Sequence, residues 1–308
     1  MMVFTAPDDM CRAIGDWRAA GETICLVPTM GAIHDGHLAL VTAAKKTAKR
    51  VVISIYVNPT QFNAGEDFDS YPRNFEADQQ IITVTGGVDA IYAPRVMYSD
   101  QHATHIVPAG VALPMEGDSR PHFFTGVATI VFKLFQHVPA DYAIFGEKDF
   151  QQLAVLRQMV ADLNLPVSLI AHPTVRESDG LALSSRNQYL SAKQRTIAPV
   201  LYQTLGKSAA EIMAGCAIQP SLDKAKHQLL TSGFTKIDYL NLRDATSLAP
   251  SLSAKGDDRL FVAAWLGETR LIDNCAIGSH AGTNLQEASG LASPTRAVYT
   301  IASHIIIR

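Results

Sequence analysis

Residues 28–37 read Pro-Thr-Met-Gly-Ala-Ile-His-Asp-Gly-His, and the arrangement of the N-terminal half follows from this stretch. It comes after an apolar, strand-like run at 23–27 and before a helix-like run at 38–49. Helix N-termini carry unsatisfied N–H groups and a partial positive charge, and glycines let the backbone approach phosphate closely. His34 and His37 add imidazole donors at the same place. The pattern predicts a triphosphate cradle where a parallel strand passes into a helix.

A pair of histidines spaced three apart is not specific to phosphate binding. Taken alone, such a pair is often solvated or caps a helix. A zinc site is disfavoured, because the helical zincin pattern has spacing four with a glutamate between the histidines. The cysteines show no paired spacing that could complete a site: Cys11, Cys25, Cys216 and Cys275. No G-x-G-x-x-G occurs, and the nearest approach to a P-loop, at 206–208, has Leu201 in place of the leading glycine.

Composition indicates an ordinary soluble protein rather than a nucleic-acid or membrane protein. The chain has 308 residues, of which 47% are hydrophobic and 18% charged, enough for a large core and two domains. A net charge of −3 and a pI near 6.4 argue against binding nucleic acid. Asp8 and Asp9 stand where a secretion leader would be basic and apolar. Scattered cysteines suggest buried thiols in a reducing compartment, so we expect a cytoplasmic protein.

Strand-like and helical patterns alternate over the first part of the chain. Strands buried on both faces are predicted at 51–57, 88–93, 141–145 and 167–171, with helices at 74–84, 127–136 and 150–163. This alternation predicts an α/β fold, a Rossmann-like doubly wound parallel sheet over residues 1–185. Ligands bind such sheets at the carboxyl ends of the strands, where the polar motifs fall.

The pattern changes after about residue 185. Ser191 and Gln194 form a capping box for a long helix to about Ala214, and a second helix is predicted at 221–231. Two strands follow, at 236–242 and 259–265. We expect a smaller α+β domain over 186–274, forming a lid. The tail at 275–308 has no functional interpretation.

Two polar segments follow predicted strands. Asn58-Pro59-Thr60-Gln61-Phe62 offers neutral amides that donate and accept, which suits a hydroxy acid, although Asn-Pro is also a common turn former. In the segment at 145–152, Lys148 brings a cation, Asp149 an acceptor, and Gln152 lies about one turn further along. Read alone, an exposed Glu-Lys-Asp is normally solvated surface.

Two further polar segments are predicted loops. The stretch at 115–121 contains Arg120, which could meet a carboxylate or phosphate, although a plain surface loop fits the same residues about as well. The stretch at 175–187 contains Ser184, Ser185 and Arg186. Such a loop can close over a triphosphate and stabilise charge on the departing pyrophosphate.

Together these segments resemble the pantothenate synthetase family, within the nucleotidyltransferases that carry His-x-Gly-His. The blocks PTMGAIHDGH, YVNPTQF, EGDSRP, FGEKDFQQL and DGLALSSRN occur in the family's order between Val27 and Asn187. His-x-Gly-His alone would imply only the superfamily, shared with cytidylyltransferases and class I aminoacyl-tRNA synthetases. The Asn-Pro-Thr-Gln-Phe and Gly-Glu-Lys-Asp blocks are far more specific.

The resemblance implies a two-step, ATP-dependent ligase. ATP and pantoate would give pantoyl adenylate and pyrophosphate, and β-alanine would then release pantothenate and AMP. It implies Mg²⁺ that arrives with ATP, no metal ligands from the protein, and a homodimer. Catalytic groups would be His34, His37, Lys148, Ser185 and Arg186. The implied ATP contacts are Met30, His34, His37, Gly146, Lys148, Asp149, Val175, Leu183, Ser184, Ser185 and Arg186. Pantoate and β-alanine would meet Gln61, Gln152 and Asn58.

One departure from the family pattern stands at 120–124. The family commonly reads Arg-Pro-Gly-His-Phe, whereas this chain reads Arg-Pro-His-Phe-Phe, so Phe123 occupies the histidine position. We do not assign His122 to the site. Two alternatives remain: another adenylyl- or cytidylyltransferase acting on a different small acid, and a silent metabolite-binding protein. The intact set of cationic and hydroxyl groups counts against the second.

Overall fold

Six parallel strands form the larger sheet of the computed structural model, which describes residues 1–63 and 65–280. They lie in the order β1-β4-β3-β2-β5-β6. Their bounds are β1 Met2–Phe4, β2 Ile24–Thr29, β3 Arg50–Ile55, β4 Ala90–Tyr92, β5 Tyr142–Gly146 and β6 Ser168–His172. The sheet grows from β2 through β3 and β4 to one side and through β5 and β6 to the other, so the strand order reverses between β2 and β5, as in a doubly wound sheet. A ligand-binding crevice is expected at the carboxyl ends of these two strands.

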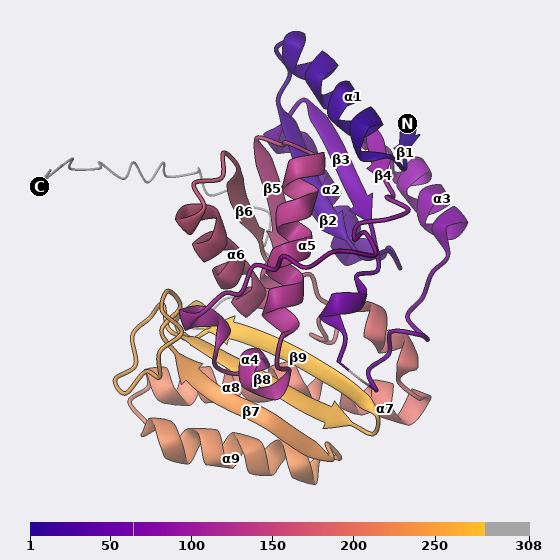
Figure 1. Ribbon diagram of the computed structural model, residues 1–308. Coiled ribbons are helices and arrows are strands. Elements are labelled where there is room, and N and C mark those ends of the chain that lie inside the picture. The colour runs from indigo at the N-terminus through magenta and orange to yellow at the C-terminus, as the bar shows by residue number, and fades with distance from the viewer. Residues whose placement is uncertain (64, 281–308) are drawn as a thin grey trace, which may run out of the picture.

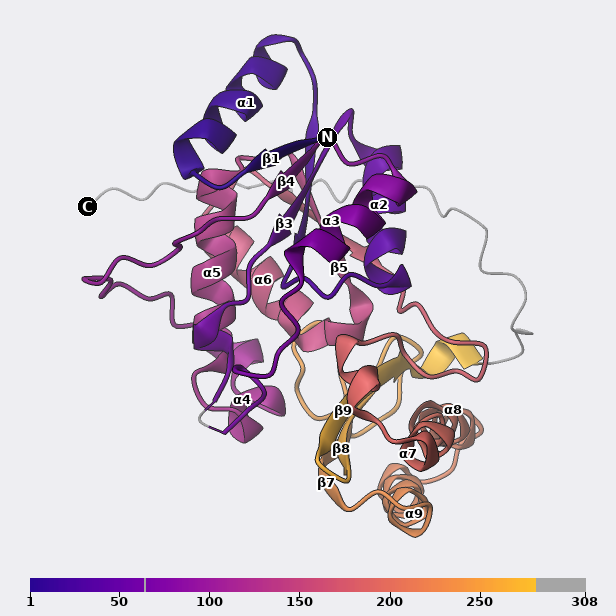
Figure 2. The ribbon, with the colours of Figure 1, turned by 90° about the vertical axis from the view of Figure 1, so that its right-hand side faces the viewer.

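Helices cover both faces of this sheet (Figure 1, Figure 2). Because strand side chains alternate, Ile24 and Leu26 of β2 join one core and Cys25 and Val27 join the other. The first core includes α1 (Pro7–Ala19), α5 (Phe123–His137) and α6 (Phe150–Asp162). The second includes α2 (Asp35–Thr47) and α3 (Phe75–Thr85). The central strands β2, β3 and β5 are therefore packed on both faces, and their carboxyl ends form a platform for the site.

A three-stranded antiparallel sheet lies across the carboxyl ends of the large sheet (Figure 1). Its strands are β7 Lys236–Arg243, β8 Arg259–Leu266 and β9 Thr269–Ala276, and its helices are α7 Ala192–Ile197, α8 Val200–Met213 and α9 Ile218–Thr231. Leu260 and Val262 of β8 face the core shared with α8 and α9. Phe261, of opposite parity, faces the larger sheet's side and packs against Phe150, with ring centroids 5.9 Å apart. The small sheet thus turns one face towards the platform.

The predicted α/β architecture is confirmed, with four differences of detail. The strand predicted at 167–171 was expected to be buried on both faces, but β6 is an edge strand and only partly covered. The long helix predicted from Ser191 is divided at Pro199, which cannot continue the hydrogen-bond ladder. The short strand β1, helix α1 and strand β9 were not predicted. Of the predicted tail at 275–308, β9 and a short 3-10 turn (Ile277–His280) take the first residues, and 281–308 lie outside the described residues.

All four cysteines are free thiols, and Cys25 and Cys275 are buried, as predicted. Cys216 is exposed, contrary to the expectation of buried thiols, because it follows the end of α8 at the surface. No helix in the described part of the chain combines the length and apolar character needed to span a membrane.

Candidate active site

A cleft of about 740 Å³ lies between the strand ends of the large sheet and the face of the small sheet. The predicted site residues that line it are Met30, His34, His37, Gln61, Gly146, Lys148, Asp149, Gln152, Val175, Leu183, Ser184, Ser185 and Arg186. Segments far apart in the chain therefore meet in one cavity. Asn58 is the exception: it is 0% exposed and does not line the cleft.

The two histidines sit at the start of α2 with defined ring orientations. His34 is the N-cap, and its Nδ1 accepts the N–H of Gly36 at 3.1 Å. The Nδ1 of His37 accepts the N–H of His34 at 3.4 Å, and the rings stack with centroids 4.0 Å apart. A Cβ on Gly36 would lie 2.8 Å from the His34 ring, so a side chain there would displace the ring from its capping position. With both Nδ1 atoms accepting, each neutral ring carries its hydrogen on Nε2 as a donor.

Both imidazoles are uncharged at neutral pH. Burial, then the neighbouring His34 and Lys148, lowers the pKa of His37 to about 3. Burial and Lys148 also lower the pKa of His34. The positive charge beside them is that of Lys148, whose ammonium lies 3.9 Å from Asp149. The pair of rings therefore supplies hydrogen-bond donors, and the lysine supplies the charge.

A buried carboxylate shapes the turn between β2 and α2. Asp78, in α3 and 5% exposed, accepts the N–H groups of Ala32 at 3.0 Å and Ile33 at 2.8 Å. These bonds hold Gly31 (φ 85°) and Ala32 (φ 50°) in left-handed conformations. Asp78 was not predicted from the sequence, because no local pattern connects a helix residue with a distant turn.

The small sheet holds the Gly-Glu-Lys-Asp segment in place. Asn274 of β9 donates to the carbonyl oxygens of Glu147 and Lys148, each at 2.9 Å. Arg259 of β8 forms an ion pair with Glu147 at 3.0 Å. Asn274 was not predicted either, since it stands at the end of a strand that the sequence pattern did not reveal. These contacts make the position of Lys148 depend on the small sheet.

Gln61 and Gln152, the two glutamines predicted to bind substrate, both line the cleft. Gln61 accepts a hydrogen bond from Asn58 through Oε1 at 3.0 Å and lines the cleft. Gln152 lines the cleft from the first turn of α6. The adjacent Gln151 also borders the cleft but is only 5% exposed, and its amide NH₂ donates to the carbonyls of Val111 and Pro114. The amide of Gln151 is therefore already engaged within the fold.

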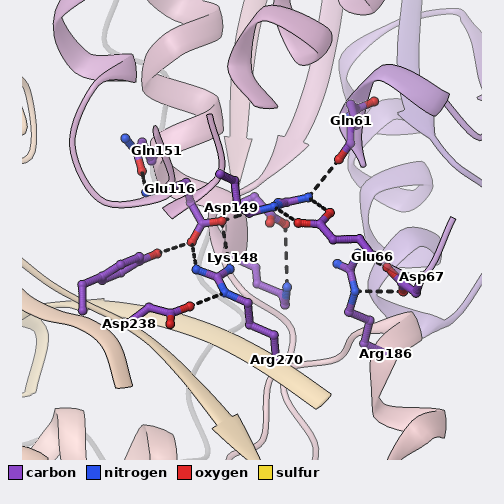
Figure 3. A network of polar contacts seen from close by, with 12 residues as sticks. Gln61, Glu66, Asp67, Glu116, Lys148, Asp149, Gln151, Arg186, Asp238 and Arg270 are labelled. Atoms are coloured by element: carbon purple, nitrogen blue, oxygen red, sulfur yellow. Dashed lines mark hydrogen bonds and ion pairs between the residues drawn. The ribbon is translucent and has the colours of Figure 1, made fainter. Parts of the chain in front are cut away.

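Ser185 and Arg186 both contact the segment that follows η1 (Pro59–Gln61). The Ser185 hydroxyl lies 3.2 Å from the hydroxyl of Tyr71. Arg186 forms two hydrogen bonds with the carboxylate of Asp67 (Figure 3). Ser184 accepts the N–H of Arg186 and so caps the short helix η4 (Ser185–Tyr189). The serine-arginine loop therefore faces the cleft with its guanidinium already paired.

A chain of buried ion pairs crosses the cleft between the two sheets (Figure 3). Glu116, in the short helix α4 (Glu116–Ser119) and 6% exposed, forms a two-bond ion pair with Arg270 of β9, at 2.8 and 2.9 Å. Burial acts to raise the pKa of Glu116, but Arg270, Tyr239 and Arg120 together hold it below its usual value. Arg120 itself binds Glu66 at 2.6 Å. Of these residues, only Arg120 was singled out from the sequence.

The segment at 120–124 places His122 at the surface and Phe123 on the wall of the cleft. His122 is exposed and does not line the cleft, in agreement with its omission from the site. Its φ of 70° is left-handed, a conformation that glycine adopts without cost. Phe123 lines the cleft, and the guanidinium of Arg120 lies 3.8 Å from its ring centroid. A phenyl ring, which offers no ring nitrogen for hydrogen bonding, thus stands where the resemblance led us to expect a histidine.

The parallel sheet, with a His-x-Gly-His turn at the strand ends and cationic groups around one cleft, defines the class of α/β proteins that carry this turn. Comparison with family models is more specific: residues 2–276 match the model of pantoate–β-alanine ligase. The chain belongs to the pantoate–β-alanine ligase family.

Individual relatives agree with this assignment. The chain is 51% identical over 267 residues to a pantothenate synthetase of Dinoroseobacter shibae, covering 86% of this chain and 95% of the relative. It is 46% identical over 275 residues to that of Caulobacter vibrioides, covering 88% and 96%.

Solved structures give the same result. Pantothenate synthetase from Thermus thermophilus matches with a TM-score of 0.82 and 41% identity, covering 90% of this chain and 99% of the other. Pantoate–β-alanine ligase from Francisella tularensis, in complex with beta-gamma ATP and β-alanine, matches with a TM-score of 0.74 and 32% identity, covering 90% and 98%.

Proposed function

We propose that this protein joins pantoate to β-alanine at the expense of ATP, through a pantoyl-adenylate intermediate, with release of pyrophosphate and AMP. Family membership and the relatives' names support this activity. The observation that carries the site assignment is the convergence of motifs from separate parts of the chain on one cleft. ATP and β-alanine accompany the Francisella relative, which supports the same substrates here.

In the first step a carboxylate oxygen of pantoate forms a bond to the α-phosphorus, and the bond to pyrophosphate breaks. A carboxylate is already a nucleophile, so the site needs donors and positive charge rather than a general base. The Nε2–H groups of His34 and His37 and the ammonium of Lys148 are of this kind. Ser185 and Arg186 would stabilise charge on the departing pyrophosphate.

We assign the remaining contacts by position along the cleft. Gly146, Asp149 and Val175 would hold the nucleotide together with Met30, and Leu183 and Ser184 would line its phosphates. Gln61 and Gln152 would bind pantoate. Asn58, which is buried behind Gln61, would act through that residue rather than touch the substrate.

Mg²⁺ would arrive as part of the substrate. Among residues 1–63 and 65–280, no group of three or more His, Cys, Asp or Glu side chains is arranged to hold a metal ion. The triphosphate itself supplies oxygen ligands, which Mg²⁺ prefers. Residues 186–274 would form a lid domain over 1–185, and the homodimeric state and cytoplasmic location expected from the sequence remain predictions.

Pyrophosphate exchange tests this function. With Mg²⁺, purified protein should incorporate labelled pyrophosphate into ATP only when pantoate is present. Adding β-alanine should produce pantothenate and AMP. Exchange that occurs without pantoate, or faster exchange with another small acid, would favour the alternative of a related adenylyltransferase. ADP as the product would contradict an adenylate mechanism.

A further inference from the structure

A line of hydrogen bonds runs from outside the cleft to Gln61. The hydroxyl of Tyr98, in the loop after β4, donates to Oδ1 of Asn58 at 3.0 Å. Nδ2 of Asn58 in turn donates to Oε1 of Gln61, also at 3.0 Å. Tyr98 does not line the cleft, whereas Gln61 does. A tyrosine remote from the ligand cavity is thus connected to one of its walls.

The side-chain amide of Asn58 has one possible orientation. Its Oδ1 meets three donors: the hydroxyl of Tyr98, and the hydroxyl and N–H of Thr60 at 3.0 and 3.4 Å. Its Nδ2 meets two acceptors, Oε1 of Gln61 and the carbonyl oxygen of Gly126 at 3.2 Å. A flipped amide would place its NH₂ group against three donors and its oxygen against two acceptors. In a side chain that is 0% exposed, such mismatches leave polar groups unpaired at full desolvation cost.

The orientation of Asn58 determines that of Gln61. Because Asn58 presents a donor, the Gln61 amide must turn its oxygen towards it. Its NH₂ group is then the part of the amide left for the cleft, and it has no hydrogen-bond partner within the described chain. The wall therefore presents a donor, which matches a carboxylate or hydroxyl oxygen of an acid substrate.

Tyr98 keeps its proton in this arrangement. Burial raises the pKa of Tyr98, so the phenol remains a donor at neutral pH. The ring is held by its neighbours, with the His102 ring centroid 4.8 Å away and the Lys133 ammonium 5.7 Å from its centroid. The donor to Asn58 is thus supplied by a group fixed by packing.

We propose that Tyr98 is a positioning residue for the acid substrate, acting through Asn58 to hold the Gln61 amide with its NH₂ group towards the cleft. The proposal rests on the proposed function, in which Gln61 contacts pantoate. It assigns selectivity for pantoate to a residue that touches no substrate.

The first test is Tyr98→Phe, measured by pantoate-dependent pyrophosphate exchange. Losing one of the donors to Asn58 should raise the KM for pantoate about three- to tenfold, with the KM for ATP and kcat changed less than about twofold. Tyr92→Phe is the matched control. Tyr92 is buried, whereas Tyr98 is partly buried, and the Tyr92 hydroxyl forms a hydrogen bond with His137 at 2.7 Å, away from the cleft. Tyr92→Phe should leave the KM for pantoate unchanged.

A double-mutant cycle with Gln61→Ala separates positioning from general loosening. If Tyr98 acts through Gln61, Tyr98→Phe should have no further effect on the KM for pantoate in the Gln61→Ala background. An equal rise in the KM for pantoate in both backgrounds would overturn the proposal, as would equal rises in the KM values for ATP and pantoate. Either result would leave the proposed function intact. A wild-type protein that shows no pantoate-dependent exchange would overturn both.

Discussion

Arg186 and Asp67 form a bidentate ion pair inside the cleft, with Nη2 2.9 Å from Oδ1 and Nε 3.1 Å from Oδ2. The pair joins the serine-arginine loop to the segment after η1 (Figure 3). In the proposed mechanism the same guanidinium meets the triphosphate, so Asp67 occupies it in the absence of nucleotide. Carboxylate and phosphate then compete for one cation.

Removing that competition should strengthen nucleotide binding. Asp67→Asn should lower the dissociation constant for ATP, measured by titration without pantoate, about two- to fivefold, the scale of one partly exposed ion pair. The exposed Asp69 provides a control, Asp69→Asn, which should have no effect. Weaker ATP binding by Asp67→Asn would show that the carboxylate supports the bound state instead.

The ammonium of Lys148 and the Nε2–H of His37 should stabilise chiefly the transition state of adenylate formation. Lys148→Ala and His37→Ala should each lower the rate of pyrophosphate exchange about a hundredfold or more, as when one preorganised donor is removed. Lys207→Ala, on the exposed side of α8, should leave the rate of pyrophosphate exchange unchanged. Near wild-type exchange at saturating ATP in either variant would exclude that residue from the proposed role.

His37 should make stability depend on pH. Its pKa is about 3 in the folded protein against 6.5 as the ordinary value, so between these values the unfolded chain binds more protons. Stability is then fully present above about pH 6.5 and is lost as the pH falls, by up to about 2 kcal/mol between pH 7 and pH 5. Urea unfolding should show a smaller loss in His37→Gln. The exposed His227→Gln should retain the wild-type dependence, and an unchanged dependence in His37→Gln would refute this prediction.

Neighbouring glutamines should give opposite phenotypes. Gln152→Leu should raise the KM for pantoate steeply while ATP binding, titrated without pantoate, stays nearly unchanged, because a site built for a hydroxyl or carboxylate loses its partner. Gln151→Leu should instead lower the free energy of unfolding by about 1–3 kcal/mol, since it unpairs the buried N–H of Glu116 and two partly buried carbonyl groups. Equal losses of ATP and pantoate affinity in Gln152→Leu would indicate a collapsed cleft.

The parts of the site that were predictable from sequence are those encoded locally. His34 and His37 share one helix start, and Gln61 and Lys148 each follow a strand whose apolar pattern is plain. Parallel strands bring such ends to one edge, so their meeting in one cleft follows from the fold.

What could not be predicted depends on contacts between distant segments. Asp78 lies 46 positions from Ala32, Asn274 lies 126 from Lys148, and Arg270 lies 154 from Glu116. No spacing rule connects such pairs. Asn58 shows the same limit within a motif: it was grouped with Gln61, but its partner Gly126 on α5 turns its amide away from the cleft. The third strand of the small sheet was not predicted, because polar and charged residues interrupt its apolar pattern, although the two-residue turn Gly267-Glu268 before it is typical of a hairpin.

The proposed mechanism depends above all on attack by the carboxylate of pantoate on the α-phosphorus of ATP. Pantoate labelled with ¹⁸O in both carboxylate oxygens tests this step, with the products of one complete reaction analysed by mass spectrometry. We expect one labelled oxygen in the phosphate of AMP and one in the amide carbonyl of pantothenate, because one carboxylate oxygen leaves with the nucleotide. Unlabelled AMP, or label in inorganic phosphate formed together with ADP, would contradict the mechanism.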